Sequence, residues 1–158
     1  MKSILFALLL SLVNLAAQAQ HEQDFVTHYM EQYGKDNNLT HLTVGPSMIK
    51  AILKIDDCKE DPELESFLKS VKSVQMLTSV MDSTSVIHYD RVEKMVQQNP
   101  GRYKMLIEHG GQRIYARRRG DAIVEIVMFM DENDSFLLVD ITGEITDKQL
   151  KRIVHSEI

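Results

Sequence analysis

The residues that could support acid–base or metal chemistry are scattered along this sequence. None of its six histidines has a zinc-like spacing to a cysteine or another histidine. Asp131 to Ser135 resembles the start of a calcium loop, but Phe136 stands where that loop needs glycine and Thr142 where it needs glutamate. We expect a hairpin turn there and no metal or other cofactor. The histidines, for which we expect surface or structural roles, are His21, His28, His41, His88, His109 and His155.

Possible nucleophiles and paired acids are equally sparse. Ser47 lacks the glycine pattern of a nucleophile elbow, and no spacing assigns it a histidine and an aspartate. Cys58 is the only cysteine, so the chain has no intramolecular disulfide, and we expect a small structural residue rather than a reactive thiol. Glu125 and Asp140 fall on neighbouring strands of the predicted sheet. Paired carboxylates can act in catalysis, but a charge ladder on a sheet is the commoner arrangement.

Composition indicates an ordinary globular protein. The chain has 158 residues, of which 44% are hydrophobic and 26% charged. Its net charge of −5 disfavours general binding to nucleic acids, which depends on clustered cations. We expect a single α+β domain over residues 20–158.

The first 19 residues have the pattern of a cleavable signal peptide. Lys2 supplies a positive end, residues 4–15 are almost wholly apolar, and Ala17-Gln18-Ala19 fits the small-x-small cleavage pattern. We expect cleavage between Ala19 and Gln20, which would give a periplasmic or secreted protein. No later stretch is long and apolar enough to predict a membrane span in the mature chain.

Helical periodicity and strand alternation divide the chain near Tyr103. Before it, the pattern predicts four amphipathic helices and two short strands. Asp61 is expected to cap the helix that begins at Pro62, and Asp56 to Asp61 to form an acidic loop. Thr146 and Gln149 form a capping box for a final helix. The expected strands before Tyr103 cover residues 39–44 and 74–78.

Turn residues predict a four-stranded antiparallel meander after Tyr103. Gly110-Gly111 is a two-residue hairpin signal. We expect a three-residue loop at Arg118 to Gly120, because a two-residue loop at Gly120-Asp121 would turn arginines onto the apolar face. Asp131 to Asp134 is the last expected connection, with four residues. The predicted pairs include Ile107 with Ile114, Ile114 with Val124, Glu125 with Asp140, and Ile126 with Val139.

Alternation gives each predicted strand an aliphatic face and a mixed face. We expect the amphipathic helices to pack on the aliphatic face. The mixed face carries a row of charged residues, Glu108, Arg113, Glu125 and Asp140, and an apolar end. This apolar end is either covered by the same chain or exposed for a partner. The best candidates for partner contacts on the mixed face are Arg113, Tyr115, Arg117, Phe129 and Phe136.

The strand sequences resemble a known family. Residues 113–117, 125–129 and 136–145, which end in a Thr-Gly-acidic-Ile signature, are similar to the exported Bacteroidetes proteins grouped as domain of unknown function 4252. The resemblance spans about Phe25 to Ile153. It implies a small cell-envelope protein with no established activity, which has been suggested to associate with envelope-stress signalling. It implies no catalytic residues.

These observations favour a non-enzymatic, exported interaction module of the cell envelope. Its partner would be an unidentified envelope protein. One alternative is a periplasmic hydrolase or metal-dependent enzyme whose acids and histidines are brought together only by folding. Another is a carrier that holds an apolar small ligand between sheet and helices.

Overall fold

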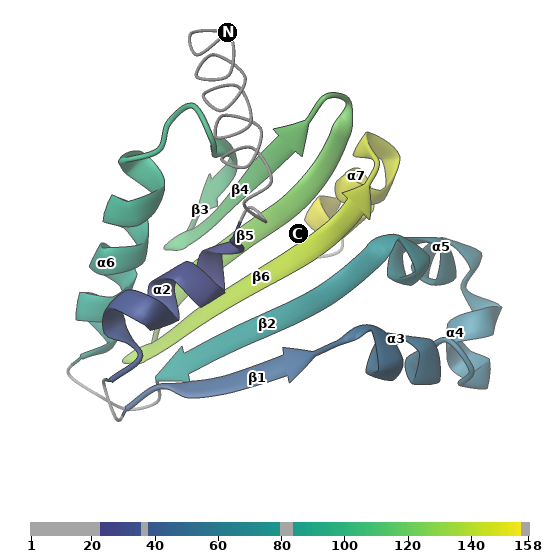
Figure 1. Ribbon diagram of the computed structural model, residues 1–158, viewed down its shortest axis with the longest axis horizontal. Coiled ribbons are helices and arrows are strands. Elements are labelled where there is room, and N and C mark those ends of the chain that lie inside the picture. Colours follow the sequence, from purple (N-terminus) through teal and green to yellow (C-terminus); the bar gives the residue numbers. More distant parts are fainter. Residues whose placement is uncertain (1–22, 36–37, 80–83, 156–158) are drawn as a thin grey trace, which may run out of the picture.

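The computed structural model describes residues 23–35, 38–79 and 84–155, which form helices and an antiparallel sheet (Figure 1). The predicted signal segment, residues 1–19, and its cleavage site lie outside these residues. The elements are α2 (Phe25–Tyr33), β1 (Thr40–Val44), α3 (Pro46–Ile52), α4 (Asp56–Glu60), α5 (Pro62–Ser70), β2 (Val71–Ser79), α6 (Ser85–Gln97), β3 (Lys104–His109), β4 (Gln112–Arg119), β5 (Ala122–Glu132), β6 (Ser135–Ile145) and α7 (Asp147–His155).

The described strands form one six-stranded antiparallel sheet. Their order is β1-β2-β6-β5-β4-β3, so β3 to β6 make the C-terminal meander and β2 and β1 extend it beyond β6. The α+β class and the meander predicted from the sequence are confirmed. The outer strands of the sheet are β1 and β3.

Capping residues place the ends of several helices. The side chain of Asp61 accepts hydrogen bonds from the backbone N–H groups of Glu63 and Leu64, and Pro62 occupies the first turn of α5. At the start of α7, the Thr146 N–H donates to the Gln149 side chain and the Gln149 N–H donates back to Thr146. Both caps are as predicted. The acidic loop predicted over residues 56–61 was wrong, because residues 56–60 form the short helix α4.

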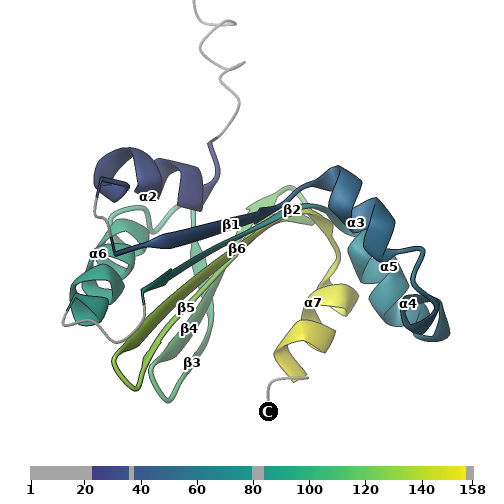
Figure 2. The same cartoon turned by 90° about the horizontal axis from the view of Figure 1, so that it is seen from below.

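The helices α2 and α6 cover the mixed face of the sheet, and α7 lies on the opposite side (Figure 2). The helices were expected on the aliphatic face, but α2 and α6 lie on the mixed face. Its apolar end is therefore covered by the same chain, one of the two alternatives that the sequence left open. The physical reason lies in the aromatic side chains, which bury more apolar area than the aliphatic ones. Tyr115, Phe129 and Phe136 lie on the mixed face and pack with side chains of both helices, including Tyr29 and Val96.

The aliphatic face is covered mainly at one end. Leu150 of α7 packs against Ile114, Ala116, Ile126 and Ile145 in a second hydrophobic cluster. Phe67 of α5 joins this cluster. Met76 and Met130, on the same face but outside this cluster, are only half-buried, so part of this face remains open.

Two turns of the meander differ from their predicted lengths. The β5–β6 turn consists of Asn133 and Asp134, both with positive φ, which these residue types tolerate. The β4–β5 turn is the two-residue Gly120-Asp121 loop, and a bulge at Val124 restores the alternation that this loop would have shifted. Residues 125–129 keep their predicted faces, although Ile114 pairs with Met128, Val127 with Asp140, and Glu125 with Thr142. The prediction for Met105 was wrong, because a bulge in β3 places it opposite Tyr115 of the mixed face and not opposite Ala116. Tyr103, also predicted on the aliphatic face, packs in the core of the mixed face.

Gly143, within the Thr-Gly-acidic-Ile signature, marks a close approach of two backbones. A Cβ atom at this position would lie 2.2 Å from the carbonyl oxygen of Ser70, at the junction of α5 and β2. We expect Gly143→Ala to lower the free energy of unfolding by about 1–3 kcal/mol, because the backbones must move apart. Denaturant unfolding measures this loss. Gly101→Ala is the control, since no heavy atom lies within 4 Å of its added Cβ; equal losses in the two variants would contradict the steric explanation.

Candidate functional site

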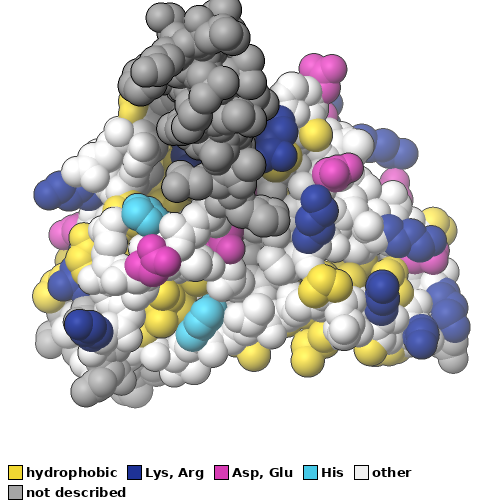
Figure 3. All heavy atoms as spheres, in the orientation of Figure 1, with side chains coloured by type: hydrophobic (Ala, Val, Ile, Leu, Met, Phe, Trp, Pro, Cys, Tyr) yellow, Lys and Arg dark blue, Asp and Glu magenta, His cyan; other side chains and the backbone are white. Residues whose placement is uncertain are grey.

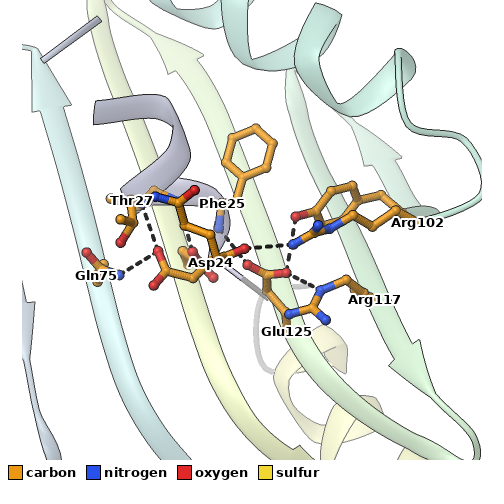
Figure 4. Close-up of polar contacts among 11 residues, drawn as sticks. Asp24, Phe25, Thr27, Gln75, Arg102, Arg117 and Glu125 are labelled. Atoms are coloured by element: carbon orange, nitrogen blue, oxygen red, sulfur yellow. Dashed lines mark hydrogen bonds and ion pairs between the residues drawn. The ribbon is translucent and has the colours of Figure 1, made fainter. Parts of the chain in front are cut away.

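A cluster of polar side chains lies buried between the sheet and the first turn of α2 (Figure 4). Glu125 of β5 and Asp140 of β6 are both fully buried, and Arg117 of β4 is 6% exposed. Asp24, which precedes α2, joins them from the helix side. We call Asp24, Glu125 and Asp140 the carboxylate cluster.

Glu125 is held by donors from three parts of the chain. The Phe25 N–H donates to Oε1 at 2.6 Å, and the Tyr103 hydroxyl donates to Oε2 at 3.1 Å. Arg117 Nε donates to the same Oε2 at 2.5 Å in a buried ion pair. Burial, followed by the charge of Glu125, raises the pKa of Tyr103. The Tyr103 hydroxyl therefore stays protonated and remains a donor to Glu125.

Asp140 is held less completely. Its Oδ2 accepts a hydrogen bond from the Val26 N–H at 3.0 Å, while Oδ1 is buried without a hydrogen-bond partner. Burial raises the pKa of Asp140 well above its usual value, and the neighbouring charge of Glu125 raises it further. The Val26 N–H and Arg117 act in the opposite direction. Arg117 is thus the buried cation that both carboxylates share.

The carboxylate cluster supplies acceptors for the N-terminus of α2. The Asp24 side chain caps the helix by accepting from the Thr27 N–H at 2.8 Å, and Gln75 of β2 donates to the same oxygen at 2.8 Å. Glu125 accepts a hydrogen bond from the Phe25 N–H, and Asp140 accepts one from the Val26 N–H. Acidic groups are favourable at this end of a helix, where unpaired N–H groups carry partial positive charge. The cluster therefore fixes α2 to the sheet.

A hollow of about 230 Å³ lies beside the carboxylate cluster, between α2 and the end of α6. Its lining is mostly polar and includes Gln23, His28, Gln98, Asn99 and Arg102. Arg102 donates to the backbone oxygen of Gln23 at 2.7 Å across this region. This polar lining does not suit an apolar ligand at this hollow.

The outer strand β1 presents a second candidate site. Four of its five residues are exposed, and Leu42 at its centre is 53% exposed. The strand contains no aspartate, glutamate, lysine or arginine, no proline and no bulge. Natural proteins usually protect outer strands with such features, because unpaired N–H and C=O groups can pair with another strand. We call Thr40–Val44 the β1 edge.

Leu42 is the exposed end of an apolar row that crosses the whole sheet. On the face that carries α7, the strand register places one apolar side chain of each strand beside the next. The row, which we call the apolar row, is Leu42, Met76, Val139, Met128, Ile114 and Ile107. Ile114 is 1% exposed and Val139 8%, against 53% for Leu42. The row would continue only if a further strand paired with β1.

The opposite outer strand is protected. Lys104 and Glu108 place charges on β3, and a bulge separates Met105 from Ile107. Both features interfere with the addition of another strand. The two edges of the sheet therefore differ in their capacity to pair.

Comparison with family models matches residues 29–153 to Domain of unknown function (DUF4252). The chain belongs to this family. The match begins within α2 and continues into α7, so it includes all six strands of the described sheet and both β5 and β6 carboxylates. No curated protein matches the chain.

The residues predicted as partner contacts in this DUF4252 domain lie on the face that α2 and α6 cover. Phe129 and Phe136 are at most 1% exposed, and Tyr115 and Arg117 at most 6%. The expectation that this face is an exposed contact surface was wrong, because the helices occupy it. Arg113 lies at the margin, where its guanidinium pairs with Glu93 of α6 and with Glu108 of β3. The prediction that Arg113 shares a cross-strand row with Glu125 and Asp140 was wrong, because Arg113 pairs with Phe129.

Other candidate groups of the DUF4252 domain have structural surroundings. Cys58 is buried, and His88 is 1% exposed with its Nδ1 2.7 Å from the Tyr29 hydroxyl. Within residues 23–35, 38–79 and 84–155, no group of three or more histidine, cysteine or acidic side chains could hold a metal ion. None of the described helices is long and apolar enough to cross a membrane.

Sequence reasoning missed the role of the α2 N-terminus. The strand pattern placed Glu125 and Asp140 on one face with Arg117, but their partners are backbone N–H groups, which every sequence contains. One signal was available in Asp24, an N-cap residue type directly before an apolar helical stripe. The β1 edge was also missed, although the absence of charge from residues 40–44 could have indicated it.

Proposed function

We propose that this chain is a non-enzymatic, exported interaction module of a bacterial cell envelope, which binds a protein partner by strand addition at the β1 edge. Export and a Bacteroidetes origin belong to this proposal; the signal-like residues 1–19 and the family resemblance support them. An association with envelope-stress signalling is the process that the resemblance suggests for such a module.

The observation that carries the proposal is the unprotected β1 edge. Strand addition supplies affinity through main-chain hydrogen bonds and specificity through alternate side chains. An added strand would pair with β1 and could place an apolar side chain beside Leu42. Exposed Met48, on the helix that directly follows β1, offers further apolar surface nearby in the sequence.

The carboxylate cluster favours a structural role over catalysis. Glu125 and Asp140 are fully buried, and α2 lies over them. A general acid or base must come within hydrogen-bond distance of its substrate, and neither buried carboxylate is accessible to one in this arrangement. The proposal therefore assigns these side chains to positioning α2.

Affinity recovery from the native envelope tests the proposal. We expect Leu42→Lys to reduce recovery of the partner on the order of tenfold, because a charge on the outer strand opposes pairing. Met105→Lys is the matched control: Met105 is 47% exposed on the opposite outer strand, and its replacement should leave recovery unchanged. Thermal unfolding of both variants establishes that they are folded. Equal recovery with wild type and Leu42→Lys would reject the β1 edge as the contact.

A further inference from the structure

We propose that the strand that pairs with the β1 edge is β1 of a second copy, in an antiparallel arrangement about a two-fold axis at Leu42. This inference rests on the proposed function of the β1 edge and identifies its partner. The two sheets would join into one continuous sheet through an isologous interface, the commonest symmetry of soluble oligomers.

The side chains of β1 are self-complementary in this arrangement. With the axis at Leu42, each Leu42 lies opposite its counterpart, Thr40 lies opposite Val44, and His41 lies opposite Thr43. On the α7 face the pairs are leucine with leucine and threonine with valine. Aliphatic and β-branched pairs of this kind stabilise neighbouring strands. The Leu42 pair also connects the apolar rows of the two copies.

Charge favours a second copy at this edge despite the acidity of the chain. The net charge is −5, so two copies repel one another overall. Residues 40–44 contain no acidic or basic side chain except His41, whose opposite residue in the pair is Thr43. The β1 edge is thus a place where two acidic molecules can approach without opposing like charges. A corresponding interface at β3 would, by contrast, contain the charged side chains of Lys104 and Glu108.

The position of β1 leaves room for this pairing. In Figures 1 and 2, β1 forms one rim of the sheet, and no described helix or strand lies beyond it. In Figure 3, hydrophobic side chains are visible on the lower surface where β1 and α3 lie. His41 Nε2 lies 3.0 Å from Gln75 Oε1, so the polar side of β1 is already tied to β2. The strand is therefore held in an extended form before a second copy arrives.

The molecular mass in solution tests the inference directly. We expect light scattering after size exclusion to give the mass of two chains for the protein purified after export. Leu42→Lys should raise the dissociation constant on the order of a hundredfold, because two like charges would face each other across the axis. Met105→Lys, on the other outer strand, should leave the dimer intact. A monomeric wild-type protein, or a dimer that Leu42→Lys does not weaken, would overturn the inference.

Crosslinking tests the register of the pair. In a Cys58→Ala background, Leu42→Cys places one thiol on each side of the axis, within reach of a disulfide between opposing residues. We expect mild oxidation to give a covalent dimer with Leu42→Cys and little with Met105→Cys. Equal crosslinking of the two variants would contradict the two-fold arrangement.

The inference and the proposed function can fail separately. A monomeric protein whose recovery of an envelope partner still depends on Leu42 would overturn the second copy as the occupant and support strand addition by another protein. A dimer that persists in Leu42→Lys, together with unchanged partner recovery, would overturn both.

Discussion

Replacing Arg117 with methionine is expected to lower the free energy of unfolding by about 3–5 kcal/mol. Arg117 is the buried cation beside Glu125, to which its Nε donates at 2.5 Å. Its positive charge also lowers the pKa of Asp140 and so favours the ionised carboxylate there. Methionine keeps much of the length of the side chain but none of its charge. Two acidic groups would then remain beneath α2 without a buried cation. Urea unfolding of the purified variant at neutral pH measures the loss.

Two further variants separate charge from packing. Arg113→Met removes another arginine of β4, but one whose side chain is 20% exposed and pairs with Glu93 and Glu108 at the margin of the sheet. Its loss should be about 1 kcal/mol or less. Adding Glu125→Gln to Arg117→Met should recover part of the stability, because an unpaired buried charge is removed. Comparable losses from Arg113→Met and Arg117→Met, with no recovery in the double variant, would show that the buried ion pair is not responsible.

The local elements could be predicted because short-range chemistry determines them. Asp61 before Pro62, the Thr146–Gln149 box and Gly110-Gly111 each satisfy or redirect the backbone within a few residues. The order of the last four strands followed from these turns. The β5–β6 register did not, because Asn133-Asp134 forms a tighter turn than its four polar residues suggested. A register error of two residues leaves the side chains of β5 and β6 on their predicted faces.

The covered face could not be predicted, because alternation determines which residues share a face but not which face the helices choose. Both faces of the meander contain enough apolar area to form a core. The aromatic side chains favour burial of the mixed face under α2 and α6. The buried carboxylates on this face also need hydrogen-bond donors, and α2 supplies N–H groups to Glu125 and Asp140. The cost of burying these acids is therefore offset by a helix whose residues lie a hundred positions or more away in the sequence.

This compensation is incomplete at Asp140, and its protonation should make stability depend on pH. Burial, and then the charge of Glu125, raises the pKa of Asp140 in the folded protein, with Asp24 acting in the same direction and Arg117 in the opposite one. The folded protein thus holds this proton more tightly than the unfolded chain does. Between the unfolded pKa of 3.8 and the raised folded value, unfolding releases the proton, so the free energy of unfolding falls as pH rises.

Asp140→Asn should remove this dependence. The amide keeps an oxygen that can accept from the Val26 N–H but carries no charge at any pH. We expect the variant and the wild type to have similar stabilities near pH 3. As pH rises from the unfolded pKa to the folded pKa of Asp140, the variant should become progressively more stable than the wild type. Above the folded pKa the difference between them becomes constant. Each unit by which folding raises the pKa contributes about 1.4 kcal/mol to that difference. Denaturant unfolding at a series of pH values measures it.

Asp147→Asn supplies a control of opposite sign. Asp147 is exposed at the start of α7, where its hydrogen bond to Arg118 lowers the pKa of the carboxyl. Its contribution to stability is therefore present at neutral pH and lost as pH falls through the folded pKa, so this variant should be the less stable one only above that range. If Asp140→Asn instead lost stability relative to the wild type as pH rose, Asp140 would be held as a favourable buried anion. The N-terminus of α2 and Arg117 would then compensate its charge fully.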